Sequence, residues 1–234
     1  MIRAVFFDWG NTLVAWEFDP ELFVEGHACG LAALGPGAPA QEEFTEAFGE
    51  QVLPLLLGPG EDEVDYVVEV GSLLASLRVD ADEAAVWRFV EAEHRVWRPA
   101  HRIEPDVLDL LDALKERGLK IGLVSNVFDP PALMRGLFAE LRLLERLDAV
   151  ALSTEAGKRK PHPAIFESAL QQAGVLPTEA VMVGDRLRED VGGAQAAGLA
   201  AIQAAWFVRD GSGVATPAIT AEAPVDVLRW LGTT

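Results

Sequence analysis

Short apolar runs alternate with amphipathic helical patterns along the part of the chain that follows residue 100. A run such as KIGLVS at 120–125 or AVMVG at 180–184 is typical of a buried strand. The predicted strands span residues 2–8, 120–125, 149–153, 180–184 and 200–204. The predicted helices span 105–117, 163–173 and 190–197, and another opens at Asp129-Pro130. Such alternation predicts a parallel sheet with helices on both faces.

Between about residues 19 and 98 the pattern is helical throughout. Asp19-Pro20 forms an N-cap and first-turn pair, and Gly35-Pro36 ends the helix that this pair begins. Further helices are predicted over 41–57, with a kink at Pro54, over 61–77 and over 80–97. Pro99 closes the block. A helical insert directly after the first strand predicts a cap domain.

Two of the cap helices carry more detailed expectations. In the helix predicted over 80–97, Asp80 and Glu83 form a start that resembles a capping box. In the helices predicted over 61–77 and over 80–97, apolar residues share one helical face, and this face is predicted to be buried inside the cap. These residues are Val64, Val67, Val68 and Leu74 in the first segment, and Val86, Phe89 and Val90 in the second.

The fold class that follows is α/β, with a Rossmann-like parallel-sheet core and a mainly α-helical cap domain. The predicted core consists of residues 1–15 and 99–234, and the predicted cap of residues 16–98. Half of the 234 residues are hydrophobic, which is enough for a sizeable core. The uncharged run Val191–Val208 contains two glutamines and is rich in alanine, so we expect helix, turn and buried strand rather than a membrane span.

The charge and cysteine content narrow the possible partners and location. A net charge of −18 argues against nucleic acid or an anionic membrane as a partner. Cys29 is the single cysteine, which excludes an intramolecular disulfide and favours a reducing, cytoplasmic location. The first residues reach Asp8 too early for a secretory signal.

Polar side chains stand at or near the ends of several predicted strands, which is where open parallel sheets bind ligands. Asp8 ends the first strand, and Ser125-Asn126 ends the second. Asp185 follows AVMVG, with Asp190 five residues later, and Lys160 precedes the helix predicted just upstream of that strand. Taken singly, each of these is an ordinary turn, cap or surface residue. Together and in this order, they predict one catalytic site.

The segment AVFFDWGNTLV at 4–14 resembles the first motif of the haloacid dehalogenase (HAD) superfamily, written D-x-D-x-T. Asp8 and Thr12 match this motif, whereas Gly10 replaces its second Asp. The strand-terminal Ser125, the Lys160 that precedes a proline, and the G-D-x-x-x-x-D loop resemble the later motifs. The resemblance covers residues 2–14 and about 100–232. The cap matches by position and helical character, as in subclass I.

The resemblance implies hydrolysis of a small phosphorylated metabolite with Mg²⁺ as cofactor. Asp8 would be the nucleophile that forms an aspartyl-phosphate, and Lys160 would hold this carboxylate and the phosphate together. The implied metal ligands are Asp8, Asp185, Asp190 and the backbone carbonyl of Gly10. The implied phosphate-binding residues are Asn11, Thr12, Ser125, Asn126 and Lys160.

Gly10 cannot protonate a leaving group or activate water, which is the task of the family's second Asp. General acid–base catalysis is worth about 10²–10⁴ in rate, so poor leaving groups suffer most from this loss. Phosphoanhydrides, acyl phosphates and aryl phosphates need little protonation and should be affected least. Other groups in or beside the cap that could replace the acid are Glu17, His27, His94 and His101, although a surface or structural role is the more common one for each.

Three other functions are compatible with a missing second Asp. Phosphonoacetaldehyde hydrolases need a cap lysine for a Schiff base, and the cap contains none, which excludes them. Metal-independent L-2-haloacid dehalogenases remain an alternative, since a cap arginine could bind the haloacid carboxylate, although Asp185 and Asp190 would repel it. A weakly active or non-catalytic binding protein that keeps the fold and the metal site is the second alternative.

Overall fold

The structure is a computed structural model that describes residues 1–232. The chain forms two compact units. The core unit contains residues 1–16, 102–127 and 138 onward, and the helical unit contains residues 17–101 and 128–137. Residues 128–137, which the sequence assigned to the core, group with the helical unit because Phe128 and Leu133 pack against its apolar centre.

The core unit is built on a six-stranded sheet in which every neighbouring pair is parallel, in the order β3-β2-β1-β4-β5-β6. The strands are β1 (Ala4–Phe7), β2 (Lys120–Ser125), β3 (Ala149–Leu152), β4 (Ala180–Gly184), β5 (Ala200–Ala204) and β6 (Thr220–Ala221). In the middle of the sheet, Val5 of β1 is in register with Ile121 and Val181. This arrangement confirms the predicted α/β fold class.

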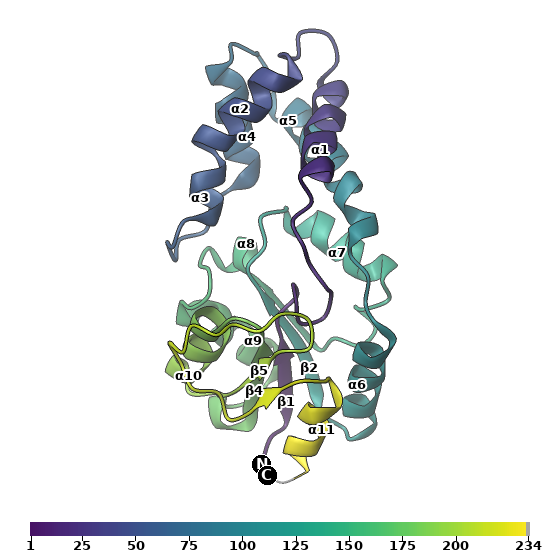
Figure 1. Cartoon of the computed structure of the whole chain (residues 1–234), viewed down its shortest axis with the longest axis vertical. Helices are drawn as coiled ribbons and strands as arrows, with labels where there is room; N and C mark the ends of the chain where they lie inside the picture. Colours follow the sequence, from purple (N-terminus) through teal and green to yellow (C-terminus); the bar gives the residue numbers. More distant parts are fainter. Residues whose placement is uncertain (233–234) are drawn as a thin grey trace. The chain divides into compact units, whose positions relative to one another are not determined.

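Helices cover both faces of the sheet (Figure 1). On one face, Phe6 and Met182 pack with Ile165 and Phe166 of α9 and with Val191 in a buried cluster. The helices and helical turns of the core unit are α6 (Pro105–Glu116), α8 (Ser153–Ala156), α9 (Pro163–Ala173), η2 (Pro177–Glu179), η3 (Leu187–Gly192), α10 (Gly193–Ala196) and α11 (Val225–Leu231). Figure 1 shows α9 and α10 on one side of the sheet and α6 on the other.

Some core elements differ from the sequence prediction. The helix predicted over 190–197 begins earlier, as one turn of π-helix in η3, and continues as α10. The short β6 and the terminal α11 were not predicted. The run Val191–Val208 contains the end of η3, all of α10 and β5, as expected for a buried segment. Among residues 1–232, no helix combines the length and apolar character needed to cross a membrane.

The helical unit consists of packed helices with a phenylalanine-rich centre. Its elements are α1 (Pro20–Leu34), α2 (Gln41–Gln51), α3 (Leu53–Leu57), α4 (Tyr66–Ser76), α5 (Glu83–Trp97), η1 (Arg98–Ala100) and most of α7 (Pro131–Glu140). Asp19 caps α1 as predicted, because its carboxylate accepts from the amides of Glu21 and Leu22. Gly30 allows α1 to approach α5 closely, since a Cβ there would lie 2.6 Å from the ring of Phe89.

Three details of the predicted cap helices are wrong. Val68 is 57% exposed, and Tyr66 takes the buried position at the start of α4 instead. The N-cap of α5 is Asp82, which accepts from the amide of Ala85, rather than Asp80. The chain breaks between α2 and α3 at Val52, two residues before Pro54. The first error arises because a run of β-branched residues offers two apolar faces.

A buried polar cluster lies inside the helical unit. The Tyr66 hydroxyl donates to Glu93 Oε2 at 2.5 Å, and the other carboxylate oxygen lies 3.5 Å from His27 Nε2. His27 Nδ1 lies 2.9 Å from the Thr45 hydroxyl. Burial raises the pKa of Glu93 to about 8 and lowers the pKa of His27 to about 4. Both side chains are therefore neutral near pH 7.

Candidate active site

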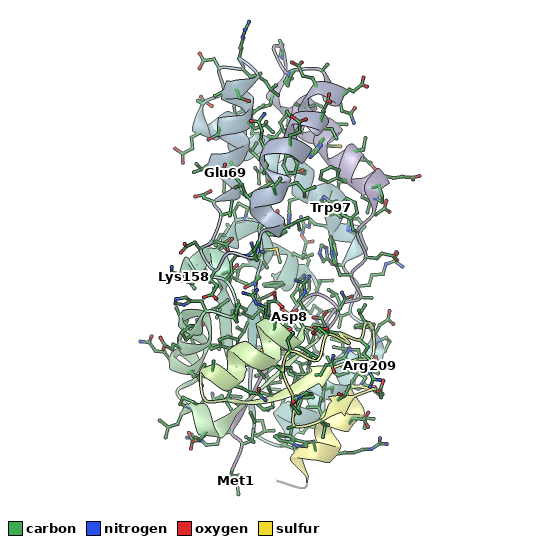
Figure 2. The ribbon with its side chains drawn as sticks, turned by 60° about the vertical axis from the view of Figure 1, so that its left-hand side comes forward. Met1, Asp8, Glu69, Trp97, Lys158 and Arg209 are labelled. Carbon is green, nitrogen blue, oxygen red and sulfur yellow. The ribbon has the colours of Figure 1, made fainter. Side chains whose placement is uncertain are left out.

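Asp8 stands directly after β1, at the carboxyl edge of the sheet. Its backbone amide donates to the carbonyl of Val183 at 3.0 Å, so the ladder between β1 and β4 fixes where the side chain begins. Figure 2 shows Asp8 at the end of β1 that lies away from Met1. Asp8 is 9% exposed. A buried central strand thus presents a single acid at its tip.

Lys160 and Ser125 both contact the same oxygen of Asp8. Lys160 Nζ lies 2.6 Å from Asp8 Oδ1, and the Ser125 hydroxyl donates to that atom at 3.0 Å. Lys160 Nζ also donates to the carbonyl of Val124 at 2.9 Å. No described residue donates a hydrogen bond to Asp8 through its second oxygen, Oδ2. The carboxylate is therefore held by one oxygen, and the other is left available for chemistry.

Asn126 positions Lys160 through two hydrogen bonds to its backbone. The Lys160 amide donates to Asn126 Oδ1 at 2.7 Å, and Asn126 Nδ2 donates to the Lys160 carbonyl at 3.2 Å. Both polar atoms of this side chain are therefore engaged by the chain itself. This engagement gives Asn126 a structural task beside the phosphate-binding role expected of it.

The acidic loop after β4 contributes Asp185 and Asp190. Asp190 Oδ2 accepts from the amide of Arg186 at 3.0 Å, and Asp190 Oδ1 lies 2.5 Å from Lys160 Nζ. Gly184 makes room for this carboxylate, because a Cβ there would lie 2.3 Å from Asp190 Cγ. The glycine at the end of β4 is thus a steric requirement for the position of Asp190.

Oxygens of Asp8, Asp185 and Asp190 lie within 4.8 Å of one another. This set fits a divalent cation, because hard cations prefer carboxylate oxygens. A second observation agrees, since Asp185 Oδ1 is buried and has no hydrogen-bond partner among the described residues. Lys160 pairs with Asp8 and Asp190, so the three carboxylates carry more negative charge than this lysine neutralises, and a cation would offset the excess.

Burial and neighbouring charges change the pKa values of Lys160 and Asp185 in ways that favour different charge states for the two groups. Burial works to lower the pKa of Lys160, but the charges of Asp190 and Asp8 outweigh it and raise that pKa. Burial, followed by the charges of Asp8 and Asp190, raises the pKa of Asp185 to about 7. Lys160 therefore stays charged, while Asp185 is half-protonated near neutral pH before any cation binds.

The other residues expected in the first motif occupy the turn after β1. Asn11 has a positive φ of 54°, and its Oδ1 accepts from the amide of Trp16 at 3.0 Å, which closes the turn. Thr12 is buried, and its hydroxyl has no hydrogen-bond partner within residues 1–232. Gly10 forms a short bridge with Val14. A Cβ at Gly10 would meet only Trp16, at 3.7 Å, so the backbone does not require glycine there.

The histidines considered as substitute acids are held within the helical unit. His27 belongs to its buried polar cluster, and His94 Nδ1 lies 3.2 Å from Asp129 Oδ1. His101 Nδ1 lies 3.0 Å from the carbonyl of Trp97. Glu17 is exposed. His27 and His101 therefore each have a hydrogen-bond partner, whereas the ring nitrogens of His94 have none among the described residues.

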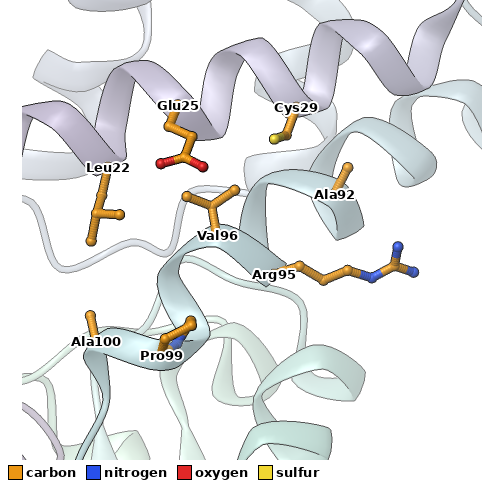
Figure 3. Close-up of a pocket in the computed structure, with 8 residues that line it drawn as sticks. All are labelled: Leu22, Glu25, Cys29, Ala92, Arg95, Val96, Pro99 and Ala100. Atoms are coloured by element: carbon orange, nitrogen blue, oxygen red, sulfur yellow. The ribbon is translucent and has the colours of Figure 1, made fainter.

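A pocket of about 680 Å³ lies in the helical unit, beside α1, α5 and η1 (Figure 3). Its lining is mainly apolar, with Leu22, Val96 and Pro99 among the residues that form it. Glu25 reaches toward the gap between the helices, whereas Arg95 extends away from it. None of the carboxylates of the core cluster lines this pocket, so it supplies no phosphoryl-transfer chemistry.

The sequence and the fold both resemble those of known proteins. The model of the haloacid dehalogenase-like hydrolases matches residues 2–198. A glyceraldehyde 3-phosphate phosphatase of Methanopyrus kandleri is 35% identical over 206 residues, which cover 87% of this chain and 84% of that protein. A pyrophosphatase of Bacillus pumilus is 36% identical over 212 residues, which cover 89% of this chain and 85% of that protein.

Solved structures share the architecture. The crystal structure of a 2-haloacid dehalogenase from Pseudomonas syringae pv. Tomato DC3000 superposes with a TM-score of 0.67 at 22% identity, covering 100% of this chain and 99% of that one. At this identity the likeness concerns the fold alone. The family match, in contrast, spans most of the sequence. The chain therefore belongs to the haloacid dehalogenase-like hydrolases, and it is a hydrolase.

Proposed function

We propose that this protein is a Mg²⁺-dependent phosphatase of small phosphorylated metabolites. The observation that carries the proposal is the cluster of Asp8, Asp185 and Asp190, two of which, Asp8 and Asp190, pair with the ammonium group of Lys160. A phosphate monoester is a dianion, so a site rich in carboxylates needs compensating positive charge to accept it. The chain supplies one buried lysine there, and the remaining charge calls for a cation.

The residues that would hold Mg²⁺ are Asp8, Asp185, Asp190 and the carbonyl of Gly10. When bound, Mg²⁺ would screen the carboxylates from the phosphate and polarise the phosphoryl oxygens. A bound cation would stabilise Asp185 Oδ1 most, because this buried oxygen has lost its contact with water and has no hydrogen-bond partner among the described residues.

Asp8 is the nucleophile in this proposal. Lys160 and Ser125 hold Oδ1, so Oδ2 attacks the phosphorus atom, and the bond to the leaving oxygen breaks as the aspartyl-phosphate forms. Water then attacks the same phosphorus atom, which releases phosphate and restores the carboxylate. Throughout both steps Lys160 stabilises the added negative charge, since its own charge is secured by Asp190 and Asp8.

Gly10 limits which phosphates react well. Its position lacks the carboxylic acid that would protonate a departing alkoxide, and His27 and His101 of the helical unit are engaged in hydrogen bonds of their own. Phosphoanhydrides, acyl phosphates and aryl phosphates leave with little protonation, so we expect them to be the better substrates. The Bacillus pumilus relative bears the name of an anhydride hydrolase, and the Methanopyrus kandleri relative that of a sugar-phosphate phosphatase.

A substrate panel tests the proposal. Phosphate esters, anhydrides and 2-haloacids are offered with Mg²⁺ and with EDTA, and phosphate and halide release are measured. Mg²⁺-dependent phosphate release supports the proposal, and its loss in Asp8→Asn identifies the nucleophile. Halide release without metal would favour the dehalogenase alternative instead. Metal binding without turnover of any compound would favour a binding protein.

Gly10→Asp tests the role of the missing acid. The Cβ fits, because its nearest neighbour would be Trp16 at 3.7 Å, so the fold should be retained. General acid catalysis predicts a gain of about 10²–10⁴ for alkyl phosphates and a much smaller one for aryl phosphates. Gly10→Asn serves as the control of equal size without an acid. An equal gain on both classes of ester, or the same gain in the Asn variant, would contradict this role.

A further inference from the structure

Two residues of the segment that follows β5 form hydrogen bonds with the two segments that carry the carboxylates, namely the turn after Asp8 and the acidic loop that contains Asp185 and Asp190. Trp206, two residues after the strand, donates from its indole Nε1 to the carbonyl of Thr12 at 3.0 Å. Thr12 belongs to the turn that begins at Asp8, so the indole anchors that turn from a distant part of the sequence. Both residues lie in the core unit.

Asp210 makes the corresponding contact with the acidic loop. Its Oδ2 accepts from the amide of Leu187 at 2.8 Å, between Asp185 and Asp190 in the sequence. Asp210 is itself anchored, because Gln203 Nε2 donates to its carbonyl at 2.8 Å. Gln203 is a buried residue of β5, and its Oε1 accepts from the Thr220 hydroxyl at 3.2 Å. The contact between Asp210 and Leu187 is thus connected to β5 and β6 of the sheet through Gln203.

The two loops need such anchors because their carboxylates repel one another. Asp8 follows β1, and Asp185 follows β4, so the two acids extend from neighbouring strands. Strand pairing extends to Asp8, whose amide donates to the Val183 carbonyl, but it does not reach the turn after Asp8 or the acidic loop. Lys160 joins Asp8 to Asp190, whereas no described side chain hydrogen-bonds to Asp185 Oδ1. The spacing of Asp185 from Asp8 therefore depends on how its loop is held.

We propose that Trp206 and Asp210 are positioning residues that set the spacing between the Asp8 turn and the acidic loop, and through it the affinity for Mg²⁺. The part of this inference that concerns Mg²⁺ rests on the proposed function, whereas the hydrogen bonds of Trp206 and Asp210 do not depend on it. Neither residue contacts a reacting atom. Each acts through a backbone group, Trp206 through the Thr12 carbonyl and Asp210 through the Leu187 amide.

Trp206→Phe and Asp210→Ala test the inference, with Glu222→Ala as the control. Trp206→Phe keeps a ring and removes the donor. Glu222 lies near in sequence and pairs with Arg209 at the surface, so its removal changes the net charge as Asp210→Ala does without touching either loop. Hydrogen–deuterium exchange in EDTA is measured on peptides covering 9–14 and 185–192.

We expect Trp206→Phe to speed exchange in 9–14 and Asp210→Ala to speed it in 185–192, while peptides from α6 and β2 stay as in the wild type. Mg²⁺ affinity, measured by calorimetry, should fall by about 10–100-fold in both variants and stay unchanged in Glu222→Ala. In the phosphatase assay of both variants, the Mg²⁺ concentration that gives half-maximal activity should rise by a larger factor than kcat falls. A merely structural role would instead speed exchange throughout the core unit.

The outcomes separate the two proposals. Unchanged exchange in both target peptides would overturn the positioning role, whatever the metal result. Wild-type Mg²⁺ affinity in both variants would overturn it as well. A wild-type protein that binds no Mg²⁺ would refute the proposed function and, with it, the link from loop spacing to metal affinity.

Discussion

Replacing Asp185 with Asn should stabilise the metal-free protein while it abolishes Mg²⁺-dependent activity. Asn has the same shape as Asp but carries no charge. Asp185 is buried, one of its oxygens lacks a hydrogen-bond partner, and Asp8 and Asp190 lie within 4.8 Å. The native protein without a cation therefore holds a carboxylate in a place that disfavours its ionised form.

The size of the effect follows from the pKa of Asp185. Burial and the two neighbouring charges raise this pKa from 3.8 to about 7. One pKa unit corresponds to about 1.4 kcal/mol, so the ionised group costs the native state about 4 kcal/mol. The pKa of Asp185 is higher in the native state than in the unfolded state. The contribution of protonated Asp185 to the stability of the native state is therefore fully present below about pH 4 and is lost as the pH rises through about 7.

Urea unfolding in EDTA at pH 5 and at pH 8, followed by tryptophan fluorescence, measures this cost. At pH 8 the free energy of unfolding of Asp185→Asn should exceed that of the wild type by up to about 4 kcal/mol, with a smaller difference at pH 5. Mg²⁺ at about 100 times its Kd should stabilise the wild type by about 2.7 kcal/mol, and the variant far less. A variant that is less stable than the wild type at pH 8 in EDTA would refute the electrostatic reasoning.

Three further predictions concern neighbouring features. Gly184→Ala places a Cβ 2.3 Å from Asp190 Cγ, so Mg²⁺-dependent turnover should fall sharply while circular dichroism shows an intact sheet. Lys160→Met leaves Asp8 and Asp190 without their buried cation, which should lower the free energy of unfolding in EDTA by about 3–5 kcal/mol, as urea titration would show. The pKa of Glu93 is raised from 4.5 to about 8, so its contribution to stability is lost as the pH rises across that range, and Glu93→Gln should flatten this part of the pH–stability profile.

The sheet was predictable because its strands are continuous apolar runs. The bounds of β2, β4 and β5 agree with those predicted, as do those of α9, which begins at Pro163 and ends before Gly174. The short β6 was not predictable, since two residues show no periodicity. In α4, local pattern could not choose between two apolar faces. Tyr66 donates to the buried Glu93, 27 residues away, and local pattern cannot reveal such a contact.

The candidate site shows the same division between local and distant information. The acids and the lysine could be found because each stands beside a strand end or a proline, where the sequence has a visible boundary. The anchors could not, because a hydrogen bond from Trp206 to the Thr12 carbonyl joins residues 194 positions apart and leaves no pattern at either end. Likewise, the two hydrogen bonds between Asn126 and Lys160 depend on a loop path that only the folded chain defines.

The central place of β1 in the sheet has a consequence for how the chain folds during synthesis. Ala4 pairs with Lys120 on one side and with Ala180 on the other, so β1 cannot be fully paired until β4 has been synthesised. The helices of residues 17–101 contact one another over shorter separations than β1 and β4 do, as Gly30 of α1 and Phe89 of α5 show, and contacts between residues closer in sequence form sooner. We expect the helices of residues 17–101 to fold on the ribosome while β1 is still unpaired. While it is unpaired, the exposed apolar β1 is a site where chaperones bind and where truncated chains aggregate.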